Sequence, residues 1–150
     1  MSDCAYGKVC ILAGHFLAYT PTMTLRILIV DDSETRRRIL RAIVHSREWT
    51  VCAEAETGSA GIAKFEESKP DLVLIDLAMP DMNGLEVAKS MTVLNPSIPL
   101  VLFTVLDIPA LVEPARNAGI AEVVCKAQPW DLVRTIERVV AKRLAQGQAQ

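Results

Sequence analysis

The sequence predicts an α/β fold with a doubly wound, five-stranded parallel sheet and helices on both of its faces. Five short apolar segments alternate with five amphipathic segments along the chain, and this alternation is typical of strand–helix units that form a parallel sheet. The segment at 72–75 is apolar throughout, as expected for a strand that is buried on both faces. With 150 residues, of which 51% are hydrophobic, the chain can bury the core of one domain.

The first two strand–helix units are expected in the first half of the chain. A strand at 25–30 precedes a helix at 33–46, where Ser33 is a residue type that favours a helix start. A strand at 50–55 precedes a helix that stops at Pro70, because proline cannot continue a helix. Apolar residues at helical spacing give the first helix one apolar face, which is formed by Ile39, Leu40, Ile43 and Val44.

The third unit contains the most informative segment, PDLVLIDLAMPDMNG at 70–84. A buried strand at 71–75 stops at the carboxylate of Asp76, and a helix at 85–94 follows before Pro96. A charge at the exit of a buried strand costs little free energy if it meets water, a metal or a partner, and much if it does not. Asp76 is therefore a candidate functional residue.

The fourth unit joins a strand at 99–103 to a weaker helix around 110–118. Pro114 lies inside this helix, where its ring and its missing N–H disturb the hydrogen-bond pattern. We therefore expect the helix to be short, to be kinked, or to begin near Glu113.

The fifth unit joins a strand at 121–125 to the last helix. Pro129 is well placed for the first turn of that helix, and apolar residues continue at helical spacing as far as Leu144. We interpret Trp130 as a packing residue. The residues after Leu144, AQGQAQ, are expected to lack regular structure.

Polar side chains follow the strands where the strands end. They are Asp31 and Asp32 after the first strand, Asp76 after the third, Thr104 after the fourth and Lys126 after the fifth. Ligands of doubly wound folds bind at this edge of the sheet. Crowded carboxylates need a cation or proton to relieve their repulsion, and Mg²⁺ prefers oxygen ligands. One carboxylate can then attack a phosphoryl group as a nucleophile. This transfer requires neutralisation of the charge on the phosphoryl oxygens more than it requires an acid or a base.

These residues, in this order, resemble the receiver domain of two-component response regulators, the CheY-like superfamily. The resemblance extends from about Met23 to Leu144. It implies a flavodoxin-like (βα)5 fold with strand order 2-1-3-4-5. It further implies that the domain is a phospho-accepting switch that assists only its own phosphorylation and dephosphorylation.

The resemblance also implies the roles of the acidic residues. Asp76 would be the phosphoacceptor. Mg²⁺ would be held by Asp32, by Asp76 and by the backbone carbonyl of Ala78, while Asp31 would act on the metal through water.

The remaining implied roles concern the phosphoryl group and the switch. Lys126 would pair with the phosphoryl group, and Thr104 would hydrogen-bond one of its oxygens and move its loop. Val123 stands where receivers commonly carry an aromatic residue, and Val105 stands where they usually carry Ala or Gly. These departures affect the usual switch mechanism more than the phosphorylation chemistry.

Three positions are expected to slow hydrolysis of the phosphorylated state. Ala78 and Leu106 lie two residues beyond the phosphoacceptor and the switch Thr, and neither side chain can orient the attacking water. Val105 adds bulk near the phosphorus. We therefore expect a long-lived phosphoryl group.

Partners and alternatives follow from the same resemblance. The expected donor is a histidine kinase or a histidine phosphotransfer protein, and the output is contact with a downstream protein. The surface of the fourth helix, fifth strand and fifth helix is the expected output face and a candidate homodimer face. An alternative is the receiver portion of a LuxR-type DNA-binding regulator. An aspartyl-phosphate hydrolase fits less well, because Leu77 and Ala78 supply no acid or base after Asp76.

Net charge, hydropathy and cysteine positions limit other functions. A net charge of −2 gives no electrostatic case for nucleic-acid binding by this domain, and no apolar stretch is long enough for a membrane helix. Cys52 and Cys125, in the second and fifth strands, are too far apart to form a disulfide if those strands are opposite edges of one sheet. Reduced thiols favour a cytoplasmic location.

The domain boundaries are expected at residues 23 and 145. Residues 1–22 are an extension that is either disordered or loosely packed, or the product of a start codon assigned too early. Residues 23–145 form the receiver domain, and residues 146–150 form a tail too short for an output domain.

The run Arg36, Arg37 and Arg38 is interpreted as a solvated helix face, which the family resemblance places near the kinase-docking surface.

Overall fold

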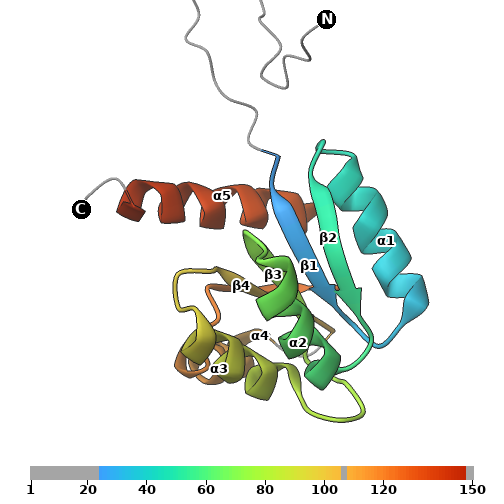
Figure 1. The fold of residues 1–150 in the computed structure, drawn as a ribbon. Coiled ribbons are helices and arrows are strands. Elements are labelled where there is room, and N and C mark those ends of the chain that lie inside the picture. The colour runs from blue at the N-terminus through green and yellow to red at the C-terminus, as the bar shows by residue number, and fades with distance from the viewer. Residues whose placement is uncertain (1–23, 106–107, 148–150) are drawn as a thin grey trace, which may run out of the picture.

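A parallel sheet of five strands, in the order β2-β1-β3-β4-β5, runs through the centre of the molecule (Figure 1). The computed structural model describes residues 24–105 and 108–147. Within these residues each strand is followed by a helix, and every strand pair is parallel. The predicted fold class and strand order are confirmed.

The elements agree closely with the predicted segments. Their bounds are β1 (Arg26–Val30), α1 (Glu34–His45), β2 (Thr50–Ala55), α2 (Gly58–Ser68), β3 (Leu72–Asp76), α3 (Gly84–Leu94), β4 (Leu100–Thr104), α4 (Ile108–Asn117), β5 (Glu122–Cys125) and α5 (Trp130–Gly147).

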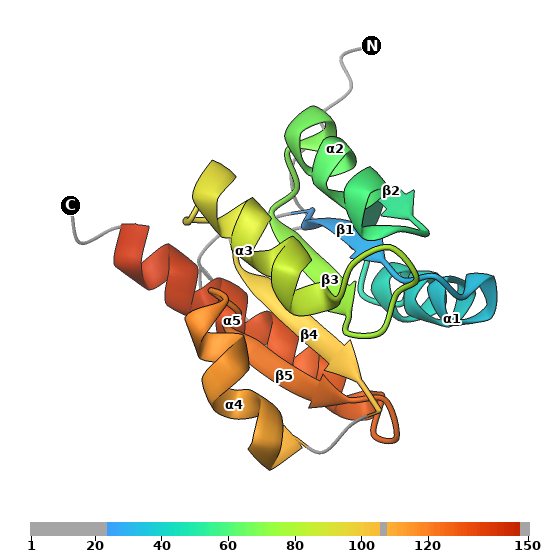
Figure 2. The same ribbon diagram turned by 90° about the horizontal axis from the view of Figure 1, so that it is seen from below.

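The helices form two layers, one on each face of the sheet (Figures 1 and 2). Buried side chains of α1 and α5 pack on one face, and those of α2, α3 and α4 pack on the other. β3 and β4 are buried along their whole lengths, because both lie inside the sheet and have helices above and below. This explains why their sequences are apolar without alternation.

Side-chain caps define where three helices begin. Ser33, Thr57 and Asn83 accept hydrogen bonds from backbone N–H groups in the first turns of α1, α2 and α3. In α1, Leu40 and Val44 are buried, as predicted. Ile39 is 50% exposed, so this member of the predicted apolar face lies outside the core. It lies about 100° from Leu40 around the helix, which is enough to take it out of the core.

The proline-containing helix α4 is short. It begins at Ile108 and has ten residues, with Pro114 inside it. The alternative start near Glu113 is therefore wrong. Ala118 donates its backbone N–H to the carbonyl of Pro114, so the chain remains coiled after the proline.

The C-terminal helix differs from the prediction at its end and in the exposure of its first residue. The helix α5 continues to Gly147, so the expected loss of regular structure after Leu144 is wrong. Ala145 and Gln146 favour helix, and no proline stops them. Trp130, the first residue of α5, is 68% exposed. Its interpretation as a packing residue is also wrong, because the core-facing side of α5 begins at Leu132.

The cysteine prediction is confirmed for the two cysteines that the structure describes. Cys52 in β2 and Cys125 in β5 are free and lie on the opposite edge strands. The predictions about residues 1–22, Leu106 and residues 148–150 concern parts of the chain outside the described residues. None of the described helices combines the length and the apolar character needed to cross a bilayer.

Candidate functional site

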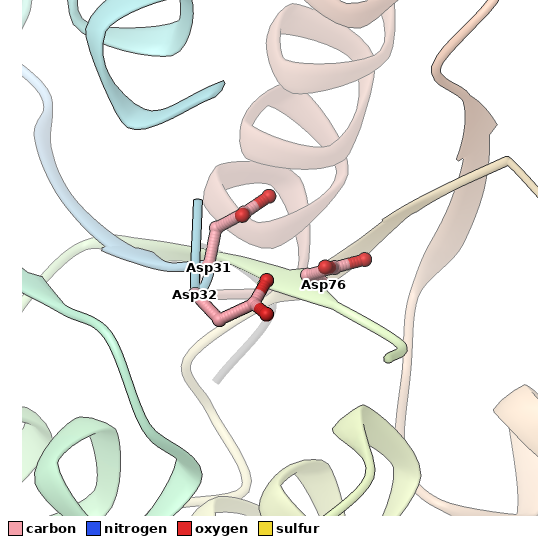
Figure 3. A group of neighbouring side chains, drawn as sticks. All are labelled: Asp31, Asp32 and Asp76. Carbon is pink, nitrogen blue, oxygen red and sulfur yellow. The ribbon is translucent and has the colours of Figure 1, made fainter. Parts of the chain in front are cut away.

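The carboxyl ends of four strands bring the predicted site residues to one edge of the sheet. Asp76 and Thr104 are the last residues of β3 and β4, while Asp31 and Lys126 directly follow β1 and β5. Figure 3 shows the carboxylates of Asp31, Asp32 and Asp76 as neighbours. One oxygen of each of these carboxylates lies within 4.8 Å of the others.

The site combines burial with charge. Asp31 and Asp76 are only 1% and 4% exposed, and Thr104 is also buried. Asp32 is the solvent-facing member, because about a third of its side chain is exposed. Buried carboxylates are stable only when cations or hydrogen-bond donors satisfy them. The structure provides two such cations.

Lys126 is the first of these cations. Its Nζ lies 2.7 Å from Oδ1 of Asp76 and 3.3 Å from Oδ2 of Asp31. The ammonium also lies 5.7 Å from the centre of the Phe103 ring, and the backbone N–H of Lys126 donates to the carbonyl of Thr104 at 2.8 Å. β4 and β5 therefore fix the lysine directly beside the predicted phosphoacceptor.

Arg36 is the second cation, and it was not predicted to belong to the site. Its Nε donates to both carboxylate oxygens of Asp31 at 2.9 and 3.0 Å. A terminal nitrogen of the same guanidinium lies 2.7 Å from Oδ1 of Asp32 and 3.2 Å from Oδ2 of Asp76. Partial burial lowers the pKa of Arg36, but the hydrogen bond to Asp31 and the three nearby negative charges outweigh it and raise that pKa.

The interpretation of the three arginines as a solvated face is correct only for Arg38. Arg37 is largely buried and donates to the backbone carbonyl of Asp31 at 2.8 Å and to the carboxylate of Glu54. A usable signal was present for Arg36, since it lies four residues after Asp32 at the start of a helix, a spacing that brings opposite charges together. Both Arg36 and Arg37 are therefore structural parts of the site.

The loop after β3 keeps Asp76 close to the start of α3. Gly84, the first residue of α3, donates its N–H to the carbonyl of Leu77 at 2.8 Å. A Cβ at position 84 would lie 2.3 Å from the backbone oxygen of Asp76. Only glycine allows this approach, which explains the glycine in the motif PDMNG.

The same loop is tied to α2 through Asp81. Its carboxylate accepts the backbone N–H groups of Gly58 and Ser59, each at 2.9 Å, and the hydroxyl of Ser59. The backbone hydrogen bonds of Ser59 and then of Gly58 hold the pKa of Asp81 well below its usual range. No local sequence pattern indicates this anchor, because Asp81 is more than 20 residues away from Gly58 and Ser59.

Three of the positions with expected effects on hydrolysis or switching lie within the described residues. Ala78 and Val105 are exposed, and Val123 in β5 is half-buried. Their expected effects on hydrolysis and switching remain predictions.

The residues fit a magnesium site by their chemistry. Three carboxylates from two chain segments offer oxygen ligands within 4.8 Å of one another, and hard oxygen ligands are those that Mg²⁺ prefers. One of the three, Asp32, faces solvent, which suits an ion that keeps several of its waters.

The fold and the arrangement of these side chains define the CheY-like class of signalling domains. The family model described as the response regulator receiver domain matches residues 27–137, and the chain belongs to this family. The predicted family is thus confirmed.

Known proteins support the same assignment. The chemotaxis protein CheY of Thermotoga maritima is 32% identical over 118 residues, which cover 78% of this chain and 98% of that protein. The CheY-like receiver domain of Methanospirillum hungatei JF-1 superposes with a TM-score of 0.75 at 27% identity, covering 81% of this chain and 98% of that one. A LuxR-family two-component response regulator of Aurantimonas sp. SI85-9A1 has the same TM-score and identity, covering 85% and 99%.

Proposed function

We propose that this protein accepts a phosphoryl group on Asp76 from a histidine kinase or a histidine phosphotransfer protein and signals through protein–protein contact. The observation that carries the proposal is the pairing of the Asp76 carboxylate with Nζ of Lys126 at 2.7 Å, at the carboxyl edge of a doubly wound sheet. This is the edge where such folds bind their ligands.

The transfer step uses Asp76 as a nucleophile. A carboxylate oxygen of Asp76 forms a bond to the phosphorus, and the bond between phosphorus and the histidine nitrogen of the donor breaks. The electron pair of that bond leaves with the imidazole. Such transfers need positioned charge neutralisation more than acid–base catalysis, and Lys126 is fixed where it can neutralise a phosphoryl oxygen on Asp76.

Mg²⁺ is the proposed cofactor. The proposed ligands are Asp32, Asp76 and the backbone carbonyl of Ala78, with Asp31 acting through water. When bound, the ion would supply positive charge that stabilises the phosphoryl oxygens. The support for this assignment is the cluster of three carboxylates and the solvent-facing position of Asp32.

Thr104 is the proposed start of the signal. It is the buried last residue of β4, and its carbonyl is already bound to the N–H of Lys126. Its hydroxyl would bond a phosphoryl oxygen, and the segment that joins β4 to α4 would move with it. With Val123 in place of an aromatic residue, this segment is the proposed moving part.

The proposed output face is formed by α4, β5 and α5. Both helices pack beside β5 (Figure 2). Exposed apolar side chains occur at Val105 before α4, at Val112 in α4 and at Trp130 in α5, and exposed apolar groups suit contact with another protein. The proposed partner is a downstream protein or a second copy of this chain in the cytoplasm.

The proposal is tested by labelling with a small phosphodonor in the presence of Mg²⁺, followed by intact-mass measurement. The protein should gain one phosphoryl group, and Asp76→Asn should gain none. Asp71→Asn is the matched control, because it makes the same change just before β3, at the opposite end of the strand from Asp76. Undiminished labelling of Asp76→Asn would overturn the assignment.

A second candidate is the receiver portion of a LuxR-type DNA-binding regulator. The similarity to the LuxR-family regulator of Aurantimonas favours it. The native reading frame distinguishes the two candidates: a helix-turn-helix encoded after residue 150 supports the second, and a stop codon supports the first.

A further inference from the structure

Arg36 contacts all three carboxylates of the proposed metal site. Its Nε holds both oxygens of Asp31, and one terminal nitrogen bridges Asp32 and Asp76. A planar guanidinium with several N–H donors in fixed directions is suited to this bridging. The arginine therefore occupies the same three carboxylates that would hold a divalent cation.

The charges of the site show what Arg36 contributes. Three formal negative charges meet two positive ones, those of Lys126 and Arg36. Lys126 contacts Asp31 and Asp76, whereas the ion pair of Asp32 is made with Arg36. Without Arg36, the metal-binding edge of the site would have one more uncompensated negative charge.

The side chains of Lys126 and Arg36 differ in how easily they can move out of the site. The side chain of Lys126 is only 9% exposed, and it is held between the ends of β4 and β5. The side chain of Arg36 is 38% exposed and projects from the first turn of α1. Its long flexible stem lets the guanidinium move into solvent while the helix stays in place.

We infer that Arg36 is a built-in competitor of the divalent cation at this site. It contacts the three carboxylates and offsets one of their negative charges when no metal is bound, and it withdraws into solvent when the metal takes its place. The inference rests on the metal site of the proposed function. A ligand can bind only to those molecules in which the competing group has left the site. Its apparent affinity is the intrinsic affinity multiplied by the fraction of molecules in that open state. Arg36 therefore lowers the affinity of the site for Mg²⁺.

The test compares Mg²⁺ binding by isothermal titration calorimetry in the full chain and in Arg36→Ala. Removal of the competitor should tighten binding by about tenfold or more, within the usual range of coupling between two ligands. Arg38→Ala is the matched control, since it removes the same charge from the same helix at a side chain that is 77% exposed. Because salt screens an exposed charge, its binding should stay within about twofold of the parent.

A second variant and a second readout keep the test independent of folding. Arg36→Gln retains hydrogen-bond donors without the charge, and it should also bind Mg²⁺ more tightly than the parent. In the parent, the side-chain Nε–H signal of Arg36 in a nitrogen-edited NMR spectrum should shift towards that of a solvated arginine as Mg²⁺ is added. The signal of Arg38 should not move.

The outcomes separate this inference from the proposal on which it rests. Equal or weaker Mg²⁺ binding by both Arg36 variants, with saturable binding by the parent, would overturn the competitor role and leave the metal site intact. Saturable binding by none of the proteins would overturn the metal site and the inference together. Tighter binding by the Arg36 variants alone supports both.

Discussion

Replacing Gly84 by alanine should strain the backbone of the phosphoacceptor itself. The new Cβ would lie 2.3 Å from the carbonyl oxygen of Asp76, and 3.0 Å from both the carbonyl carbon of Asp76 and the Cα of Leu77. Ordinary contacts begin near 3.4 Å, so α3 and the end of β3 would have to separate by roughly 1 Å in a close-packed interior. Overpacking of this kind costs about 1–3 kcal/mol.

Thermal unfolding and phosphorylation rate are the two assays for Gly84→Ala. The midpoint should fall by about 3 °C for each kcal/mol lost. Labelling by a small phosphodonor should also slow at temperatures where the variant is folded, because the strain falls on Asp76. Gly147→Ala is the open-space control, since its Cβ would meet nothing within 4 Å.

A second control separates backbone strain from simple crowding. A Cβ at Gly58 would also meet close atoms, but these belong to side chains, Cγ of Met82 at 2.3 Å and Cγ2 of Val87 at 2.7 Å, and none of them to the backbone. Gly58→Ala should therefore cost less than Gly84→Ala. If Gly84→Ala melts and is labelled like Gly147→Ala, the proposed role of this close approach is refuted.

Three further predictions address other parts of the site. The pKa of Asp81 is lower in the folded protein than its ordinary value of 3.8. The ionised carboxylate should therefore stabilise the folded state fully at a pH well above 3.8, and this stabilisation should be lost as the pH falls towards the folded pKa. Asp81→Ala should thus lower the melting temperature at neutral pH and less so in acid, whereas a pH-independent difference would contradict this. Lys126→Ala should still bind Mg²⁺ but lose the change in amide exchange around Thr104 that a beryllofluoride phosphoryl mimic causes; an unchanged response would show that the lysine is misassigned. The phosphoryl group should decay more slowly in the parent than in an Ala78→Asn, Leu106→Glu double variant, and equal decay would refute the hydrolysis argument.

The fold was predictable because several local signals agree. Capping residues such as Ser33 and Asn83 mark helix starts, and the apolar strands β3 and β4 have no polar alternation that would suggest an exposed face. The end of α5 was not predictable by the same means. No glycine or proline follows Leu144 until Gly147, so the sequence contains no stop signal where the apolar pattern ends.

The core of the site was predictable, but its arginine was not recognised. Strand ends position Asp31, Asp76 and Lys126 directly, so their order in the sequence was enough to place them together. Arg36 and Arg38 are chemically identical, and the positions of the carboxylates relative to the first turn of α1 decide which one enters the site. The spacing of Arg36 four residues after Asp32 is a local signal for one of these contacts, whereas its contact with Asp76 at the end of β3 depends on the tertiary structure.

The most direct test of the central claim locates the phosphoryl group in the chain. Borohydride reduces an acyl phosphate of aspartate to homoserine, which marks the position permanently for peptide mass spectrometry. After treatment with a phosphodonor and Mg²⁺, we expect homoserine at position 76, with Asp31 and Asp32 unmodified. Homoserine at either of those two positions, or its absence from position 76 in a labelled protein, would contradict the assignment of Asp76 as the phosphoacceptor.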